Sequence, residues 1–351
     1  MTDSMVAETA TRIFRDLCDP QEILRATDER WKVPAWAALE DAGLALAWVP
    51  DALGGAGADL EDGFAILRQT GRFALPLPVA ETLLAGWLLA RAGISSPSGP
   101  MSLTTRAGQP VRVTAKGTLD GRLRAIPFGR DTKHLALLVM RENGTWAVAL
   151  VETAAARLSH GAALSGDPLD TVDLEGVRPL ALKDAPAGLH DDALLMGAAV
   201  RAMQMAGALE AVLDIAVAYA NERVAFERPI AKFQAVQHNL ARLAGEVAAS
   251  VAAAGSAADA IATAEQFDEG VFLEAAAAKI RVGEAAAEGA GIAHQVLGAI
   301  GFTREHILHR FTQRLWTWRD DFGNESFWAV KLGNAVAANG PDALWPMLAA
   351  R

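Results

Sequence analysis

Four long, alanine-rich stretches in the second half of the chain repeat apolar residues at helical spacing, and no other feature restricts the fold as strongly. They cover residues 191–221, 238–264, 270–297 and 305–314. The apolar face of the first stretch is formed by Leu209, Val212, Leu213, Ala216 and Ala220. Acidic residues such as Glu210 and Asp214 lie off that face, which is typical of an amphipathic helix. Because alanine favours helices that pack closely, we expect an antiparallel four-helix bundle, followed by a last helix from Asn324.

The sequence predicts helices in the first part of the chain and strands in the middle part. Residues 1–97 read as amphipathic helices joined by turns. Between residues 98 and 185, short runs rich in branched residues follow one another, at 103–105, 111–114, 135–139 and 146–151. Turn sequences at 119–121 and 142–144 separate them, which predicts a small antiparallel β domain, either a sandwich or a barrel. We therefore expect a mainly α protein with a middle β domain, divided into residues 1–97, 98–185 and 186–351.

Charge and composition narrow the class of protein. The 351 residues include 32 Lys and Arg against 42 Asp and Glu, so the net charge is −10. We do not expect such a chain to bind nucleic acid or an anionic membrane, because both require a basic face. Cys18 is the only cysteine, which excludes an internal disulfide. The sequence shows no secretory leader and no run of about 18 uncharged apolar residues, so we expect a cytoplasmic protein without a membrane span.

The helical pattern breaks at residues 219–244, YANERVAFERPIAKFQAVQHNLARLA, which carry the clearest binding signal. Pro229 interrupts the helix because it lacks the amide proton that a helix interior needs. Arg223, Phe226 and Gln234 therefore lie at a hinge between two long helices. A permanent cation, an aromatic ring and an amide in one place suit a ligand that has both a phosphate and a flat ring.

Other residue patterns in the sequence bear on the chemistry of the protein. Residues 49–57, VPDALGGAG, most simply form a loop with positive backbone angles; a phosphate-cradling loop is the alternative, although no Lys-Ser/Thr pair follows it. No histidine has the spacing and carboxylate partner of a metal site, so no metal is predicted for His238, His294, His306 and His309. No G-x-S-x-G segment occurs, which disfavours a serine hydrolase.

Three segments together resemble the acyl-CoA dehydrogenase family. The hinge sequence ERVAFERPIAKFQ is similar to the family's R..FG.PI..FQ, and residues 295–305, QVLGAIGFTRE, are similar to its Q..GG.G(F/Y)..E. Residues 49–57 are similar to its VPE..GG.G, and the three segments come in the family's order along nearly the whole chain. The resemblance implies a flavoenzyme that uses FAD to oxidise an acyl-CoA thioester between its α and β carbons and passes the electrons to an electron-transfer flavoprotein. It also implies an N-terminal helical domain, a β domain and a C-terminal bundle through which the protein assembles as a tetramer.

The same resemblance assigns contacts to the cofactor. It puts Arg223 and Phe226 on the pyrophosphate and adenine of FAD, with Gln234 nearby. Glu227 stands where the family has glycine, which places a carboxylate beside the phosphate site. The alternative interpretation is that Arg223 pairs with Glu222 or Glu227 and that Phe226 belongs to the core.

A second cofactor contact is implied for the end of the third long helix. Gln295 and the turn from Gly298 to Gly301 would contact the adenosine held by the neighbouring subunit. The turn reads GAIG rather than GG.G, so Ala299 replaces a glycine whose backbone approaches the nucleotide in the family.

The catalytic base is also inferred from the resemblance. Of the two positions that the family uses, the one after the hinge arginine is Val224, which cannot act as a base. The other lies in a YEG segment, which residues 316–323 replace; there Asp320 aligns with the glutamate, or Asp321 with a slip of one residue. The alternative is that Arg319 and these aspartates are a surface cluster that caps a helix.

The β domain lacks the family's T(E)P.AGSD segment, which contacts flavin and substrate. Short members of this kind resemble one half of heteromeric enzymes that act on bulky acyl-CoA such as steroid side chains. We therefore expect a subunit of such an enzyme, in a homo- or heterotetramer with another acyl-CoA dehydrogenase chain. The alternatives are a non-catalytic structural or regulatory subunit without its own base and flavin, and a flavin oxidase or monooxygenase on the same scaffold.

Overall fold

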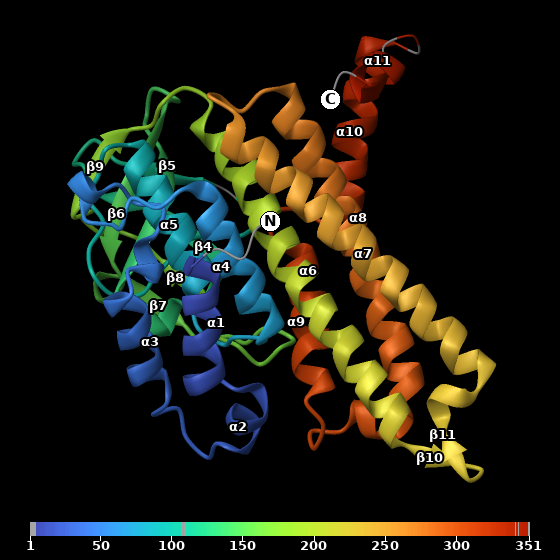
Figure 1. The fold of residues 1–351 in the computed structure, drawn as a ribbon. Helices are drawn as coiled ribbons and strands as arrows, with labels where there is room; N and C mark the ends of the chain where they lie inside the picture. Colours follow the sequence, from blue (N-terminus) through green and yellow to red (C-terminus); the bar gives the residue numbers. More distant parts are fainter. Residues whose placement is uncertain (1–4, 107, 109, 341, 343, 350–351) are drawn as a thin grey trace.

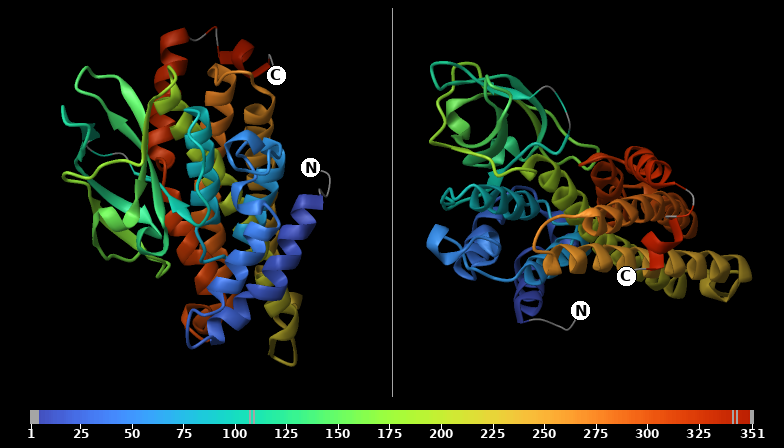
Figure 2. Two further views of the ribbon diagram at one scale, coloured as in Figure 1. Left: turned by 90° about the vertical axis from the view of Figure 1, so that its left-hand side faces the viewer. Right: turned by 90° about the horizontal axis from the view of Figure 1, so that it is seen from above.

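The computed structural model describes residues 5–340 except 107 and 109, together with 342 and 344–349. Helices precede and follow a region of strands (Figure 1), so the expected class, mainly α with a middle β region, is confirmed. Figure 2 shows the strands on one side of the molecule, with the helices beside them.

The N-terminal helices are α1 (Met5–Leu17), α2 (Pro20–Arg25), α3 (Lys32–Asp41), α4 (Leu60–Arg72) and α5 (Val79–Arg91). Asp19 caps α2, because its carboxylate accepts hydrogen bonds from the amides of Gln21 and Glu22. Between α3 and α4 the glycine-rich segment forms a loop, in which Gly54 and Gly57 have φ angles of 94° and 62°. The loop interpretation of this segment is thus confirmed, and its glycines satisfy backbone geometry.

Two sheets follow α5. The larger has the strand order β3-β2-β5-β6-β9, with β1 also beside β5. Its strands are β1 (Met101–Ser102), β2 (Val111–Val113), β3 (Leu119–Asp120), β5 (His134–Met140), β6 (Trp146–Glu152) and β9 (Ala181–Asp184). The smaller sheet consists of β4 (Arg122–Pro127), β8 (Leu169–Asp173) and β7 (Arg157–Ser159). Apolar residues of both sheets, such as Leu137 of β5 and Val172 of β8, share one separate hydrophobic core.

The structure corrects two details of the expected β domain. It is not wholly antiparallel, because β1 and β2 both pair with β5 in the parallel direction; the chain makes a long excursion through β3 and β4 before β5, which permits a parallel pair. In addition, residues 119–121 are not a turn. Leu119 is fully buried in β3, and the chain reverses earlier, where Gly117 has a φ of 72°.

The second half of the chain forms the expected bundle of long helices. Its members are α6 (Leu189–Glu222), α7 (Gln234–Thr263), α8 (Glu269–Leu297) and α9 (Leu308–Asp320), followed by α10 (Glu325–Asn339) and α11 (Leu344–Ala349). Asn324 caps α10, since its side chain accepts a hydrogen bond of 3.0 Å from the amide of Phe327. A short hairpin of β10 (Val224–Ala225) and β11 (Arg228–Pro229) joins α6 to α7 at the end of the bundle (Figure 1).

The N-terminal helices and the bundle share one continuous hydrophobic core. The helices α4 and α6 approach most closely at two glycines: a Cβ atom on Gly71 would lie 1.9 Å from the carbonyl oxygen of Gln204, and one on Gly207 would lie 2.0 Å from that of Arg68. No side chain fits between these backbones. By length and composition α6 is apolar enough to cross a membrane, but 61% of its most apolar window is buried inside the fold. Its place at the centre of the core explains that composition.

Candidate functional site

The hinge predicted from the sequence is a structural junction. Arg223 follows the last residue of α6, and its amide donates to the Tyr219 carbonyl oxygen over 2.9 Å while its own carbonyl oxygen accepts from Ile230 over 2.8 Å. The tip of the hairpin between β10 and β11 is formed by Phe226 and Glu227, with φ angles of 51° and 66°. Both lie in the left-handed region, where a residue other than glycine is strained.

A cleft of about 500 Å³ lies beside this junction. It is lined by Tyr219, Glu222, Arg223, Leu297, Ala299 and Ile300. The structure therefore brings the hinge arginine and the GAIG turn at the end of α8 together within one chain, although more than 70 residues separate them in the sequence. We call this the hinge cleft.

The two side chains expected to bind the cofactor are both exposed at the hinge, and Arg223 lines the hinge cleft. Arg223 is exposed, and within the described residues no ion pair joins it to Glu222, Glu227 or any other carboxylate. Phe226 is 90% exposed, and its ring lies edge-on to that of Phe233, with ring centroids 6.2 Å apart. The alternative interpretation, in which Arg223 pairs with a neighbouring glutamate and Phe226 belongs to the core, is therefore wrong.

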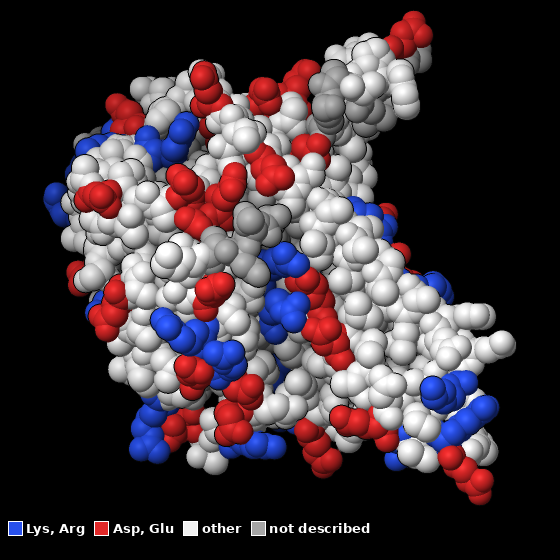
Figure 3. All heavy atoms as spheres, in the orientation of Figure 1, with Lys and Arg blue, Asp and Glu red and all other residues white. Residues whose placement is uncertain are grey.

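The charge around the hinge is mainly positive. Arg228 and Lys232 lie on the same short segment as Arg223, against Glu222 and Glu227, and the guanidinium of Arg228 lies 4.3 Å from the centroid of the Phe233 ring. Figure 3 shows Lys and Arg side chains gathered over the β10–β11 hairpin. A cation and an exposed ring beside a cleft fit the adenine and pyrophosphate portion of a dinucleotide. The residues present therefore fit that half of FAD.

The other predicted cofactor residues lie at the ends of α7 and α8. Gln234 is the exposed first residue of α7, and Gln295 is exposed near the end of α8. Gly298 has a φ of 65° and open space around it, whereas Gly301 is buried against Leu297. Their contacts with a cofactor stay predictions.

The two aspartates considered as a base differ sharply in environment. Asp320 is exposed on the last turn of α9 and has no ion pair with any described residue. Asp321 is 2% exposed and accepts hydrogen bonds from the hydroxyl of Thr105 over 2.9 Å and from Nε of Arg201 over 3.0 Å. The role of Asp320 as a base is tested by none of these contacts and stays a prediction.

Asp321 belongs to a buried cluster of charges that the sequence analysis missed. Arg201 of α6 also donates to Glu81 of α5 over 2.6 Å and to Gln204 over 2.5 Å. Burial disfavours the charge on Arg201, but Glu81 and Asp321 outweigh it and raise the pKa of Arg201. An arginine inside the apolar stretch GAAVRAMQMAG was the available signal, because such a residue must have a buried partner.

Lys279 of α8 completes this cluster from the other side. Its ammonium group donates to the carbonyl oxygens of Arg319 over 2.6 Å and Gly323 over 2.7 Å, so it holds the end of α9 in place. Burial lowers the pKa of Lys279 to about 8. The amide of Phe322 donates to the Thr105 carbonyl oxygen over 2.7 Å, which joins this end of α9 directly to the β domain.

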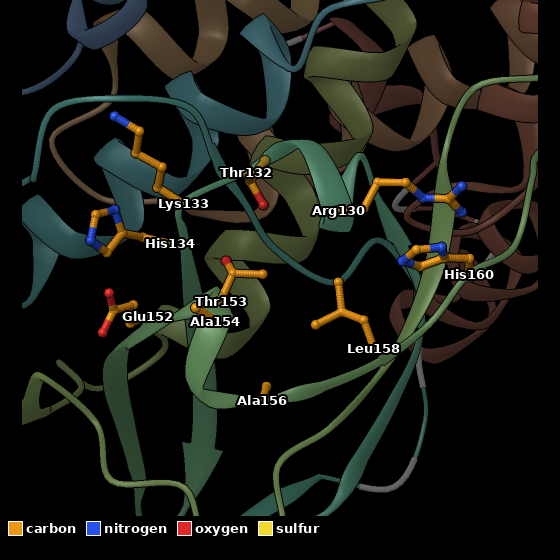
Figure 4. A pocket seen from close by; sticks show the side chains of 10 residues that line it. All are labelled: Arg130, Thr132, Lys133, His134, Glu152, Thr153, Ala154, Ala156, Leu158 and His160. Carbon is orange, nitrogen blue, oxygen red and sulfur yellow. The ribbon is translucent and has the colours of Figure 1, made fainter.

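A second cleft of about 500 Å³ lies in the β domain. It is lined by Arg130, Thr132, Lys133, His134, Glu152, Thr153, Ala154, Ala156, Leu158 and His160. Figure 4 shows cationic side chains at both ends of this cleft, Arg130 at one and Lys133 at the other. Arg130 is bound to the buried carboxylate of Asp170, whose pKa it lowers against the effect of burial. None of the residues predicted from the sequence lines this cleft.

A helical N-terminal region, a two-sheet β region and a bundle of long helices together define the acyl-CoA dehydrogenase fold. Residues 189–318 match the family model for the acyl-CoA dehydrogenase C-terminal domain. The chain belongs to the acyl-CoA dehydrogenase family.

Comparison with particular proteins points the same way. The chain is 31% identical over 297 residues to acyl-CoA dehydrogenase FadE34 of Mycobacterium tuberculosis, covering 82% of this chain but only 39% of FadE34. It is 28% identical over 322 residues to acyl-CoA dehydrogenase IpdE2 of the same organism, covering 88% of this chain and 89% of IpdE2. Among solved structures, the ChsE4-ChsE5 complex from M. tuberculosis superimposes with a TM-score of 0.86 at 22% identity, covering 97% of this chain and 99% of the matched chain.

Proposed function

We propose that the chain is one subunit of a heteromeric, FAD-dependent acyl-CoA dehydrogenase that oxidises a bulky acyl-CoA, such as one with a steroid side chain. The observation that carries this proposal is the contrast between its two candidate sites. At the hinge, Arg223 lines the cleft and Phe226 is exposed on the adjoining hairpin, so both are free to take a ligand. At the end of α9, in contrast, the buried carboxylate of Asp321 is already bound by Arg201. Asp320, the other candidate, is exposed and has a shorter side chain than the family's glutamate, so the proposal places the base on a partner subunit and the nucleotide half of the cofactor site on this chain.

In this proposal the residues of the chain bind and orient the cofactor. Arg223 would bind the pyrophosphate of FAD and Phe226 would pack against its adenine, with Gln234 and Gln295 as further polar contacts. FAD held there would supply the hydride-accepting chemistry that oxidation at Cβ of the thioester requires, and the electrons would pass to an electron-transfer flavoprotein. Residues that place the cofactor correctly contribute to catalysis, because a small misplacement of the reacting atoms lowers the reaction rate steeply.

The packing at the end of α9 supports a base supplied by the partner. The Phe322 ring is buried against Gly197, on which a Cβ atom would lie 2.3 Å from the ring. Thr105 of the β domain binds both the Phe322 amide and the Asp321 carboxylate. A carboxylate held in this way is not available to accept a proton from a substrate.

Flavin content of the assembled enzyme tests the proposal. The chain is co-expressed with an acyl-CoA dehydrogenase chain that is encoded by a neighbouring gene. Bound flavin is then measured from the visible spectrum of the purified complex. The variant Arg223→Gln is expected to lose most of its flavin, while the unfolding midpoint of the flavin-free protein stays unchanged. Arg122→Gln, a change of an exposed arginine of β4, is expected to keep the flavin. A full complement of flavin and turnover in the isolated chain would reject the heteromer.

The sequence-based assignment of Asp320 is tested in the same complex. With the base in the partner, Asp320→Asn is expected to leave kcat within about twofold, since general-base catalysis contributes about 10²–10⁴-fold where it operates. A loss of about 10²–10⁴-fold in kcat, with flavin content unchanged, would show instead that Asp320 is the base.

A non-catalytic subunit that binds no flavin is the second candidate function. Val224 and Ala299 favour it, because both replace residues that the family uses, and Ala299 lines the hinge cleft itself. In that case Arg223→Gln would change neither the flavin content nor the turnover of the complex.

A further inference from the structure

Two arginines on α9, Arg310 and Arg314, lie one helical turn apart and face a single carboxylate. Nη2 of Arg314 donates to Asp167, on the loop between β7 and β8, over 2.6 Å. Its Nη1 donates to the carbonyl oxygen of Arg310 over 2.9 Å. The other oxygen of Asp167 accepts a hydrogen bond of 2.9 Å from the Ser165 hydroxyl. Two guanidinium groups and one carboxylate leave one positive charge in excess.

Three N–H groups of this pair are buried and have no acceptor among the residues that the structure describes. They are Nε and Nη2 of Arg310 and Nε of Arg314. Arg314 is only 2% exposed, and within the described part of the chain no ion pair involves the side chain of Arg310. Burial, and then the charge of Arg314, lower the pKa of Arg310 to about 10, so it remains a cation at neutral pH. A buried cation with unsatisfied donors is strongly unfavourable, and the pair is incomplete as it stands.

The histidines near the start of α9 add no negative charge. His309 follows Leu308 at the start of α9, and it lowers the pKa values of both His294 and His306, in addition to the effect of their burial. His294 itself is 6% exposed and leaves its Nδ1 atom without a partner. These histidines therefore supply no counter-charge for Arg310 and Arg314.

We propose that Arg310 and Arg314 form a binding site for a phosphate-type oxyanion. Several acceptor oxygens on one anion match the three free N–H groups better than one more carboxylate does, and guanidinium groups bind phosphate through paired hydrogen bonds. Asp167 holds Arg314 from the far side and so orients it. The site shares no residue with the hinge cleft. The pyrophosphate of a dinucleotide and the phosphates of a CoA thioester both offer the required chemistry.

Calorimetric titration of the full chain with inorganic pyrophosphate tests this site separately from the proposed function. The titration is carried out on Arg223→Gln, so that the hinge cleft does not contribute, with ionic strength matched by chloride. This variant is expected to bind pyrophosphate, adding Arg310→Gln weakens the affinity at least tenfold, and adding Arg12→Gln, a change of an exposed arginine on α1, does not. Equal affinity with and without Arg310, or no binding once Arg223 is replaced, would overturn the proposal.

A stability measurement gives an independent readout. Because Arg310→Met removes a buried unpaired charge, it is expected to raise the unfolding midpoint in the absence of anions and to abolish the further rise that pyrophosphate causes. A lower midpoint in Arg310→Met would mean that the side chain serves packing alone, against the proposal. Displacement of pyrophosphate by FAD or by coenzyme A then identifies which phosphate source occupies the site.

Discussion

Arg201 and Asp321 form a fully buried ion pair of 3.0 Å, although one lies in the middle of α6 and the other just beyond the end of α9. With Glu81 on α5, the pair ties the N-terminal helices, the central helix and the end of the bundle to one another. Arg201→Met would leave the buried carboxylate of Glu81 without its ion-pair partner and Asp321 with only the more distant guanidinium of Arg106, 3.9 Å away. We expect the free energy of unfolding to fall by about 3–5 kcal/mol, measured by urea denaturation.

The control for this prediction is Arg72→Met. Arg72 also pairs with two carboxylates, Glu210 and Asp214, but it is 35% exposed. Its loss should lower the free energy of unfolding by less than about 1 kcal/mol. Similar losses in the two variants would contradict the special role of the buried cluster.

The crossing of α4 and α6 should tolerate no side chain. An alanine in place of Gly71 or Gly207 puts its methyl group within 2.0 Å of a backbone oxygen, so the two helices must separate. We expect each variant to lose about 1–3 kcal/mol of unfolding free energy. Gly245→Ala on α7 is the matched control, since nothing lies within 4 Å of the added methyl group; alanine there should stabilise the helix by about 1 kcal/mol.

The tip of the hinge hairpin should be stabilised by glycine. Glu227 has a φ of 66°, so Glu227→Gly relieves backbone strain and should raise the free energy of unfolding by about 1 kcal/mol. Glu222→Gly, at the end of α6, should instead lower it by about as much as glycine costs within a helix, roughly 1 kcal/mol. A loss of stability in Glu227→Gly would show that the carboxylate, rather than the strain, dominates at this position.

Stability should fall in mildly acidic solution. Burial, and then the charge of His309, lower the pKa values of His294 and His306 in the folded state. The unfolded chain therefore binds more protons than the folded chain below about pH 6.5, and stability is lost as the pH falls through that range.

The effect is measured by comparing urea midpoints at pH 7.5 and 5.5. Each such histidine contributes at most about 1.4 kcal/mol per pH unit. His294→Gln keeps a polar group for its contact with the Thr312 hydroxyl, 3.0 Å from the histidine Nε2 atom, but does not titrate. This variant should show a smaller loss between the two pH values, and an unchanged loss would contradict the assignment.

Several local features could be predicted from the sequence. The helices were recognisable because apolar residues at a spacing of three and four mark one face, and the hinge was recognisable because Pro229 stops that pattern. The exposed Asn324 cap also depends only on residues within one turn. The prediction of a turn at 119–121 was wrong, because Leu119 is fully buried in the sheet core and tertiary burial outweighs the local preference for a turn.

The sequence by itself determined the order of helices and strands, the break near Arg223 and the family signature, since each depends on residues that are close together in the chain. Only the tertiary structure decided that Asp321 rather than Asp320 is buried, that Arg201 binds it, and that Arg223 meets the GAIG turn in one cleft. These relationships join positions far apart in the sequence. They depend on which charges the packed helices exclude from water, and a burial of that kind leaves no periodic pattern along the chain.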